Sequence, residues 1–112
     1  MEKFIKTFKA LSNETRLRIL NILVLKECCV SEVMWVLDIS ESRASRQLAI
    51  LKETEFIKSR KEGSCLYYCL NDEPGGSFTQ GIANMAMELS AKSDLLRRDR
   101  LILKKILESR AE

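Results

Sequence analysis

The order of hydrophobic and polar positions predicts four helices in the first half of the chain. Near the N-terminus, apolar residues recur at helical spacing and predict a first helix of about ten residues. These residues are Phe4, Ile5, Phe8 and Leu11. A second predicted helix, over 14–25, is apolar around most of its circumference, which is typical of a buried central helix. A third begins at Val30, and a fourth over 41–53 follows Ser40, a residue type favoured at a helix N-cap.

After the fourth helix the period changes from helical to alternating. Two short strands are predicted over 56–61 and 65–70, with Glu62-Gly63-Ser64 as the hairpin turn between them. The segment 71–76, Asn-Asp-Glu-Pro-Gly-Gly, is the clearest break in the chain. From 77 to 110 there is no proline, which predicts one or two C-terminal helices.

This order of elements predicts a mainly α protein with a small β-hairpin, a winged helix-turn-helix. At 112 residues, with 46% apolar and 31% charged residues, the chain is expected to form one domain over 1–112. The helix-turn-helix would span 30–53 and the wing 56–70. In such folds the first helix of the pair braces the second, whose N-terminal outer face enters the major groove of DNA.

The predicted reading surface combines short polar side chains with arginines. Arginine can bind guanine and glutamine can bind adenine through paired hydrogen bonds. On the fourth helix the candidates are Ser42, Arg43, Ser45, Arg46 and Gln47, and on the wing Lys58, Arg60 and Lys61, which suit phosphates or the minor groove. A net charge of only +3 leaves the alternative of a solvated helix face and a charged hairpin. The order of the elements favours binding to double-stranded DNA.

Three segments resemble the ArsR/SmtB family of regulators. The stretch 11–20 is similar to the family's opening signature, 39–52 to its recognition helix and 60–70 to its wing. Gln47 stands where the family usually has histidine. The resemblance implies a homodimeric repressor of operator DNA, paired through helices at 1–11 and 77–110. It also implies that an inducer lowers the operator affinity.

The C-terminal segment has an interrupted apolar stripe that bears on the dimer. Its members are Met85, Leu89, Leu96, Leu103 and Leu107, with breaks around Lys92 and Asp99. A long amphipathic helix without a partner in its own chain suits a subunit interface. The alternative is that the helix folds back on its own core. A dimer would place two reading helices about one DNA turn apart and predicts a palindromic operator.

The cysteines are candidates for sensing an inducer. Arsenic- and cadmium-responsive members of the resembling family carry Cys-Val-Cys at the start of the third helix, and here Cys29 matches the first thiol, Ser31 replaces the second and Cys28 is extra. This implies Cys28 and Cys29 as ligands for As(III), Sb(III) or Cd(II), since thiolates select soft ions. Adjacent side chains diverge on helix and strand alike, so one ion could join both only if the backbone there is irregular. Space filling and redox sensing stay open as alternatives.

Other sites and classes are disfavoured by the sequence. Without histidine the resembling family's zinc- or nickel-type site, with its His and Asp ligands, is excluded. Cys65 and Cys69 would lie about 13 Å apart on a strand, so they are expected to be packing residues.

An enzyme is not expected, since there is no histidine to activate a nucleophile and no Cys-x-x-Cys pair. No cofactor is expected for folding. Free thiols and the absence of a long apolar run predict a cytoplasmic protein without membrane contact. A winged helix that binds proteins remains an alternative function.

Overall fold

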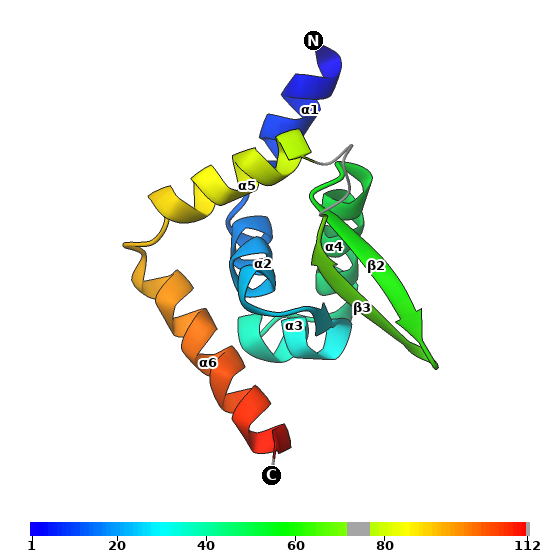
Figure 1. Cartoon of the computed structure of the whole chain (residues 1–112), viewed down its shortest axis with the longest axis vertical. Coiled ribbons are helices and arrows are strands. Elements are labelled where there is room, and N and C mark those ends of the chain that lie inside the picture. Colours follow the sequence, from blue (N-terminus) through cyan, green and yellow to red (C-terminus); the bar gives the residue numbers. More distant parts are fainter. Residues whose placement is uncertain (72–76, 112) are drawn as a thin grey trace.

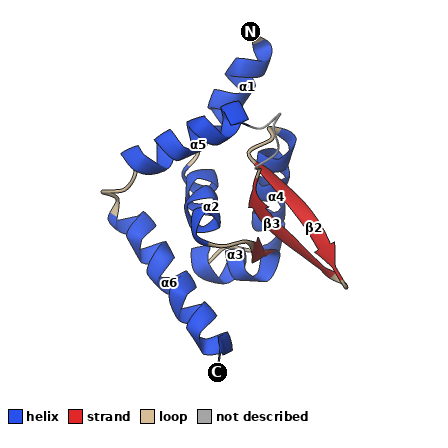
Figure 2. Ribbon diagram, in the orientation of Figure 1, coloured by secondary structure: helices blue, strands red, loops and turns tan. Residues whose placement is uncertain are grey.

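The computed structural model describes residues 1–71 and 77–111 and has the architecture of a winged helix-turn-helix (Figures 1 and 2). The elements in chain order are α1 (Glu2–Leu11), α2 (Glu14–Leu25), β1 (Cys28–Cys29), α3 (Val30–Leu37), α4 (Glu41–Glu53), β2 (Ile57–Glu62), β3 (Cys65–Leu70), α5 (Ser77–Leu89) and α6 (Asp94–Ala111). The predicted fold class, mainly helical with a small antiparallel sheet, is confirmed. No helix within these two ranges is long and apolar enough to cross a membrane.

Helix α2 is the centre of the molecule, as its sequence predicts. It begins after Asn13, whose side chain accepts a hydrogen bond from the Arg16 backbone N–H at 3.0 Å. Ile19, Leu20 and Ile22 are fully buried. The helix contacts α4, α5 and α6 as well as β3. A helix with neighbours on so many sides needs apolar residues around most of its circumference, which explains its pattern.

Helices α3 and α4 form the helix-turn-helix. Helix α3 ends where Asp38 adopts a left-handed conformation with φ of 57°, which turns the chain toward α4. Ser40 caps α4 by accepting a hydrogen bond from the Arg43 N–H at 3.2 Å. Ala44, Leu48 and Leu51 are fully buried, so α4 turns its polar face outward.

The sheet has one strand more than the sequence predicts. Its order is β1-β3-β2, all antiparallel, with Cys28 opposite Tyr68 and Cys29 opposite Tyr67. The sequence predicts only a short connection over 26–29, because two residues are too few to show an alternating period. The hairpin of β2 and β3 is confirmed, and its turn places Gly63 at a φ of 62°, where glycine is favoured.

The C-terminal segment forms two helices, and the second packs on its own chain. Helix α6 contacts both α2 and α3, and its Leu103 is fully buried. The expectation that the C-terminal helix has no partner in its own chain is therefore wrong for α6. The break in the apolar stripe at Asp99 arises because this buried residue pairs with Arg18. The break predicted over 71–76 lies, from residue 72 onward, outside the described residues.

Candidate nucleic-acid interface and thiol sites

The outer face of α4 carries the residues predicted to read DNA. Ser42, Ser45 and Arg46 are exposed. Within the described residues, the Arg46 guanidinium has no hydrogen-bond or ion-pair partner. Its five donors are therefore available to an acceptor outside the chain.

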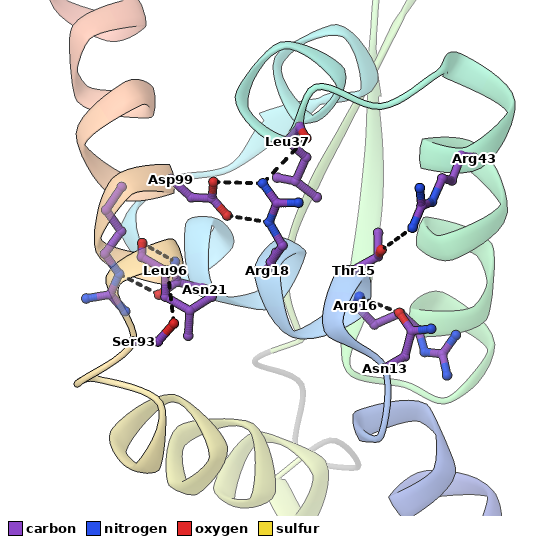
Figure 3. Close-up of polar contacts among 11 residues, drawn as sticks. Asn13, Thr15, Arg16, Arg18, Asn21, Leu37, Arg43, Ser93, Leu96 and Asp99 are labelled. Carbon is purple, nitrogen blue, oxygen red and sulfur yellow. Dashed lines mark hydrogen bonds and ion pairs between the residues drawn. The ribbon is translucent and has the colours of Figure 1, made fainter.

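The two other candidates on α4 are in contact with the first turn of α2. Arg43 donates from Nη2 to Thr15 Oγ1 at 3.0 Å, and Gln47 Oε1 accepts from Arg16 Nη1 at 2.8 Å. Figure 3 shows Arg43 and Thr15 reaching toward each other across the gap between the helices. Arg16 also donates from Nε to the Ala10 carbonyl at 2.7 Å. The end of α1, the start of α2 and helix α4 are thus joined by side-chain hydrogen bonds.

The basic residues of the wing lie in different surroundings. Lys61 is exposed, while Lys58 is partly buried opposite Cys69. Arg60 forms ion pairs with Glu27 and Glu62, and its guanidinium carbon lies 5.0 Å from the centre of the Tyr67 ring. Its hydrogen bonds to Glu27 lower the pKa of that carboxyl.

The three basic candidates on the wing thus differ in their partners and in their exposure. Arg60 is already neutralised by two carboxylates of its own chain, whereas Lys61 is exposed. Lys61 therefore stays the predicted phosphate contact of the wing.

Cys28 lies in the hydrophobic core. Its side chain is fully buried, and its Sγ–H donates to the Lys26 carbonyl at 3.4 Å. Burial, helped by the nearby Glu32 carboxylate, raises the pKa of the Cys28 thiol to about 12. The thiolate form that binds soft ions is therefore strongly disfavoured at neutral pH.

Cys29 is the N-cap residue of α3 and belongs to a polar cluster, formed with Glu32 and Arg110, that the sequence does not reveal. Its backbone N–H donates to Glu32 Oε1 at 2.9 Å, and Glu32 Oε2 accepts from Arg110 Nη1 at 2.7 Å. The Glu32 side chain is buried, with 3% of its surface exposed, while that of Arg110 is 48% exposed. The spacing of Cys29 and Glu32 is that of a capping box, with cysteine in place of the usual serine or threonine. Because cysteine is not a usual N-cap residue, the sequence pattern of a capping box is not evident here.

The structure does not bring the Cys28 and Cys29 thiols together. Both residues lie in β1, where successive side chains point to opposite faces, and only Cys28 enters the core. Within the described ranges, no group of three or more Cys, Asp or Glu side chains is arranged to hold a metal ion. A shared site on these two residues stays a prediction, and it would require β1 to leave the sheet.

A second polar seam joins α2 to α6 (Figure 3). Arg18 donates from Nε and Nη2 to the two carboxylate oxygens of Asp99, at 2.8 and 3.0 Å. Asn21 donates from Nδ2 to the Leu96 carbonyl at 2.9 Å and accepts from Arg100 Nε at 2.6 Å. Asp99 and Asn21 are 1% and 2% exposed. This seam fixes α6 against the central helix.

Comparison with known proteins identifies the class and then the family. The chain resembles solved winged-helix regulators, among them reduced HlyU from Vibrio cholerae, with a TM-score of 0.68 and 30% identity over 79% of this chain and 88% of that one. A model of the bacterial regulatory proteins of the arsR family matches residues 13–59. The chain is 32% identical over 74 residues to the arsenical resistance operon repressor of Bacillus subtilis, covering 65% of this chain and 70% of that protein. The chain belongs to the arsR family, which confirms the resemblance seen in its sequence and agrees with the prediction that it is not an enzyme.

The curated relatives differ in how much of their length is matched. The chain is 45% identical over 69 residues to the cadmium resistance transcriptional regulatory protein CadC homolog of Staphylococcus aureus, covering 61% of this chain and 57% of that protein. It matches 49% of an SmtB homolog of Synechocystis and 58% of the arsenic resistance regulator ArsR2 of Pseudomonas putida. The chain thus spans about half the length of these relatives.

Proposed function

We propose that the protein is a homodimeric transcriptional repressor that binds operator DNA through α4 and is released by a thiophilic ion. The observation that carries this proposal is the outer face of α4, where Ser42, Ser45 and Arg46 are exposed while the opposite face of the helix is buried and packs against α2 and α3. A polar helix face with an unpaired arginine, followed by a hairpin with Lys61 exposed, suits the grooves and phosphates of a duplex.

The apolar surface on α1 and α5 supports the proposed dimer. Phe8, Met85 and Leu89 are 56%, 62% and 79% exposed. Helices α1 and α5 contact each other and lie at the same end of the molecule (Figure 1). The residues that α1 buries in its own chain are Thr7 and Ala10, and the exposed side chains of Ile5 and Phe8 are available to a second subunit.

An arginine substitution tests the DNA interface. Arg46→Ala should weaken operator binding by about 1–3 kcal/mol, because the guanidinium would lose its contact with a base or phosphate. The measurement is fluorescence anisotropy at fixed salt with a duplex selected from a random pool by the purified protein. The matched control is Arg98→Ala, an exposed arginine on α6.

Two outcomes would contradict the DNA-binding proposal. If Arg46→Ala bound the operator as tightly as the wild type does, the outer face of α4 would not be the DNA-binding surface. Binding of the wild-type protein that does not fall with rising salt, or no binding to any duplex, would favour a winged helix that contacts proteins instead.

A charge placed on the apolar surface tests the dimer. Phe8→Glu should shift the mass in light scattering from two subunits to one, since a carboxylate would have to be buried at the interface. Operator affinity should fall at least about tenfold, because two reading helices no longer bind as a unit. Leu66→Glu, at a 44% exposed position on the wing, is the control for mass and should stay dimeric. A wild-type protein that is monomeric at micromolar concentration would contradict this part of the proposal.

The proposal also names a class of inducer, a soft metal or metalloid ion. Relatives are named for cadmium and arsenical resistance, and thiolates select such soft ions. Cys29 caps the start of α3, which packs against α4, so an ion bound there would act on the position of α4. As(III), Sb(III) or Cd(II) titrated into the protein–DNA complex should release the duplex.

A redox inducer is a second candidate, favoured by the likeness to a structure titled reduced HlyU. The oxidant diamide, added in place of the ions, distinguishes the two. Release by diamide and by no ion would replace the metal-ion proposal with the redox one.

A further inference from the structure

The three-stranded sheet sorts its cysteines onto two faces. Residues opposite each other in an antiparallel sheet share a face, and successive residues alternate between faces. Cys28 is opposite Tyr68, and both pack with the hydrophobic core, which defines the inner face. The other three cysteines therefore occupy the outer face: Cys29 is opposite Tyr67, and Cys65 and Cys69 flank Tyr67 along β3.

The spacing on this face selects pairs that could share one ion. Cys65 and Cys69 are four residues apart on one strand, about 13 Å, which is too far for a common ion. Cys29 lies diagonally across from each of them, at a typical Cα distance of about 7–8 Å. Two metal–sulfur bonds of about 2.3 Å each, together with rotation of the side chains, can span such a diagonal.

Cys65 is the better partner for Cys29. It is exposed and follows the turn at Gly63, so its end of the hairpin is the least constrained by packing. The sheet register places both cysteines beside Tyr67. Negative charge on the Cys65 sulfur, the largest cause, and on the Cys29 sulfur raises the pKa of the Tyr67 phenol, in agreement with this placement. Cys69 is opposite Lys58 on β2 and is partly buried.

We infer that Cys29 and Cys65, and not Cys28, form a two-thiol site for a soft ion such as As(III) or Cd(II) across the outer face of the wing. The inference rests on the proposed function in taking this ion to be the inducer. Binding would link the wing to the first residue before α3, and so couple the hairpin to the helix-turn-helix.

The chemistry is balanced for trivalent arsenic without any redox change. Arsenous acid, As(OH)₃, would lose two hydroxyl groups as two As–S bonds form, and each departing hydroxyl takes one thiol proton to leave as water. Phenylarsine oxide is a suitable probe, because its As=O group is replaced by two As–S bonds with release of one water. It therefore binds stably only where two thiols come together.

The test measures binding of this probe to the reduced 112-residue chain without DNA. Intact-mass spectrometry should show one phenylarsine adduct per chain, with the adduct at least about tenfold weaker in Cys29→Ser and in Cys65→Ser. Cys69→Ser, on the same face and strand, is the matched control and should bind as the wild type does. Cys28→Ala should also keep the adduct; circular dichroism checks its fold, since Cys28 is in the core.

A second measurement on the unaltered chain keeps the inference falsifiable if the Cys28 variant does not fold. Iodoacetamide labelling with peptide mapping should show that the adduct protects Cys29 and Cys65 and leaves Cys69 reactive. Protection of Cys28 with Cys29, protection of Cys69 in place of Cys65, or no adduct would overturn the assignment. Anisotropy with the selected duplex is measured separately, so failure of DNA binding, which sinks the proposed function, is distinguishable from failure of the thiol site.

Discussion

Helix α2 has two polar seams, and they differ in burial. On the side of α6, Arg18 and Asp99 pair with 16% and 1% of their side chains exposed, and Asn21 completes the seam. On the side of α4, Arg43 and Gln47 are held by Thr15 and Arg16, but Arg43 is exposed and Gln47 is partly so. Figure 3 shows the Arg18–Asp99 pair on one side of α2 and the Arg43–Thr15 contact on the other.

The difference in burial separates stability from exchangeability. A buried charged pair is costly to break, since either partner left alone keeps an uncompensated charge. A hydrogen bond at an exposed arginine exchanges readily with water or a phosphate, and its net contribution is small. The α6 seam is therefore expected to hold the fold, and the α4 seam to release its side chains to DNA.

The largest expected effect is on the α6 seam. Asp99→Ala should lower the free energy of unfolding by about 3–5 kcal/mol, toward the lower end because the Arg18 side chain keeps some contact with water. Urea denaturation at a fixed protein concentration measures it. Asp94→Ala removes a carboxylate whose side chain is 95% exposed on the same helix, and it should change stability by less than about 0.5 kcal/mol.

Two observations would change this interpretation of the α6 seam. Equal losses for Asp99→Ala and Asp94→Ala would show that burial does not separate the two sites. A double substitution of Arg18 and Asp99 by leucine should recover much of the loss, since no charge is then left unpaired. A double variant as unstable as Asp99→Ala would show that the unpaired Arg18 charge is not the cause of the loss.

The next effect is on DNA binding and not on stability. Arg43→Ala should weaken operator binding by about 1–3 kcal/mol, because a contact with a base or phosphate is lost. Its unfolding free energy should fall by no more than about 1 kcal/mol, the typical net value of one hydrogen bond. Anisotropy and urea denaturation on the same preparation give both numbers. A stability loss comparable to that of Asp99→Ala, with unchanged affinity, would make the α4 seam structural.

The two seams also show what a sequence can reveal. The buried centre of α2 and the outward polar face of α4 follow from apolar periodicity alone, and so does the hairpin. The Arg18–Asp99 pair does not, because its partners are 81 residues apart and Asp99 reads as a gap in an apolar stripe. A matched charge inside a core becomes visible only when the fold places the partner opposite.

In the candidate site, too, the sequence predicts the type of chemistry but not the contacts that the fold creates. The type of each residue on α4 predicts its chemistry, but not that Arg43 already has an acceptor on α2. For the cysteines, the resemblance to a Cys-Val-Cys segment suggested Cys28 and Cys29 as a pair, while the two-residue strand β1 turns them to opposite faces. A strand so short carries no period, so its pairing with β3 and the resulting face of each thiol were beyond sequence reasoning.

The smallest expected effect is that of Thr15→Val. It tests whether the hydrogen bond from Arg43 to Thr15 must break when DNA binds or instead orients Arg43 for DNA. Thr15→Val keeps the shape of a side chain that is 5% exposed and removes only the acceptor of Arg43. Stability should change by no more than about 1 kcal/mol, since the exposed guanidinium can turn to water. If Arg43 must leave Thr15 to reach a base, the variant no longer loses that bond on binding. Operator affinity, measured by anisotropy, should then rise about two- to tenfold. The control is Thr7→Val on α1, where the threonine is also 5% exposed and its hydroxyl donates to the Lys3 carbonyl. This variant should leave the operator affinity unchanged. A fall in affinity would mean instead that Thr15 orients Arg43 for the groove, and the two seams would then differ in burial but not in their role as fixed supports.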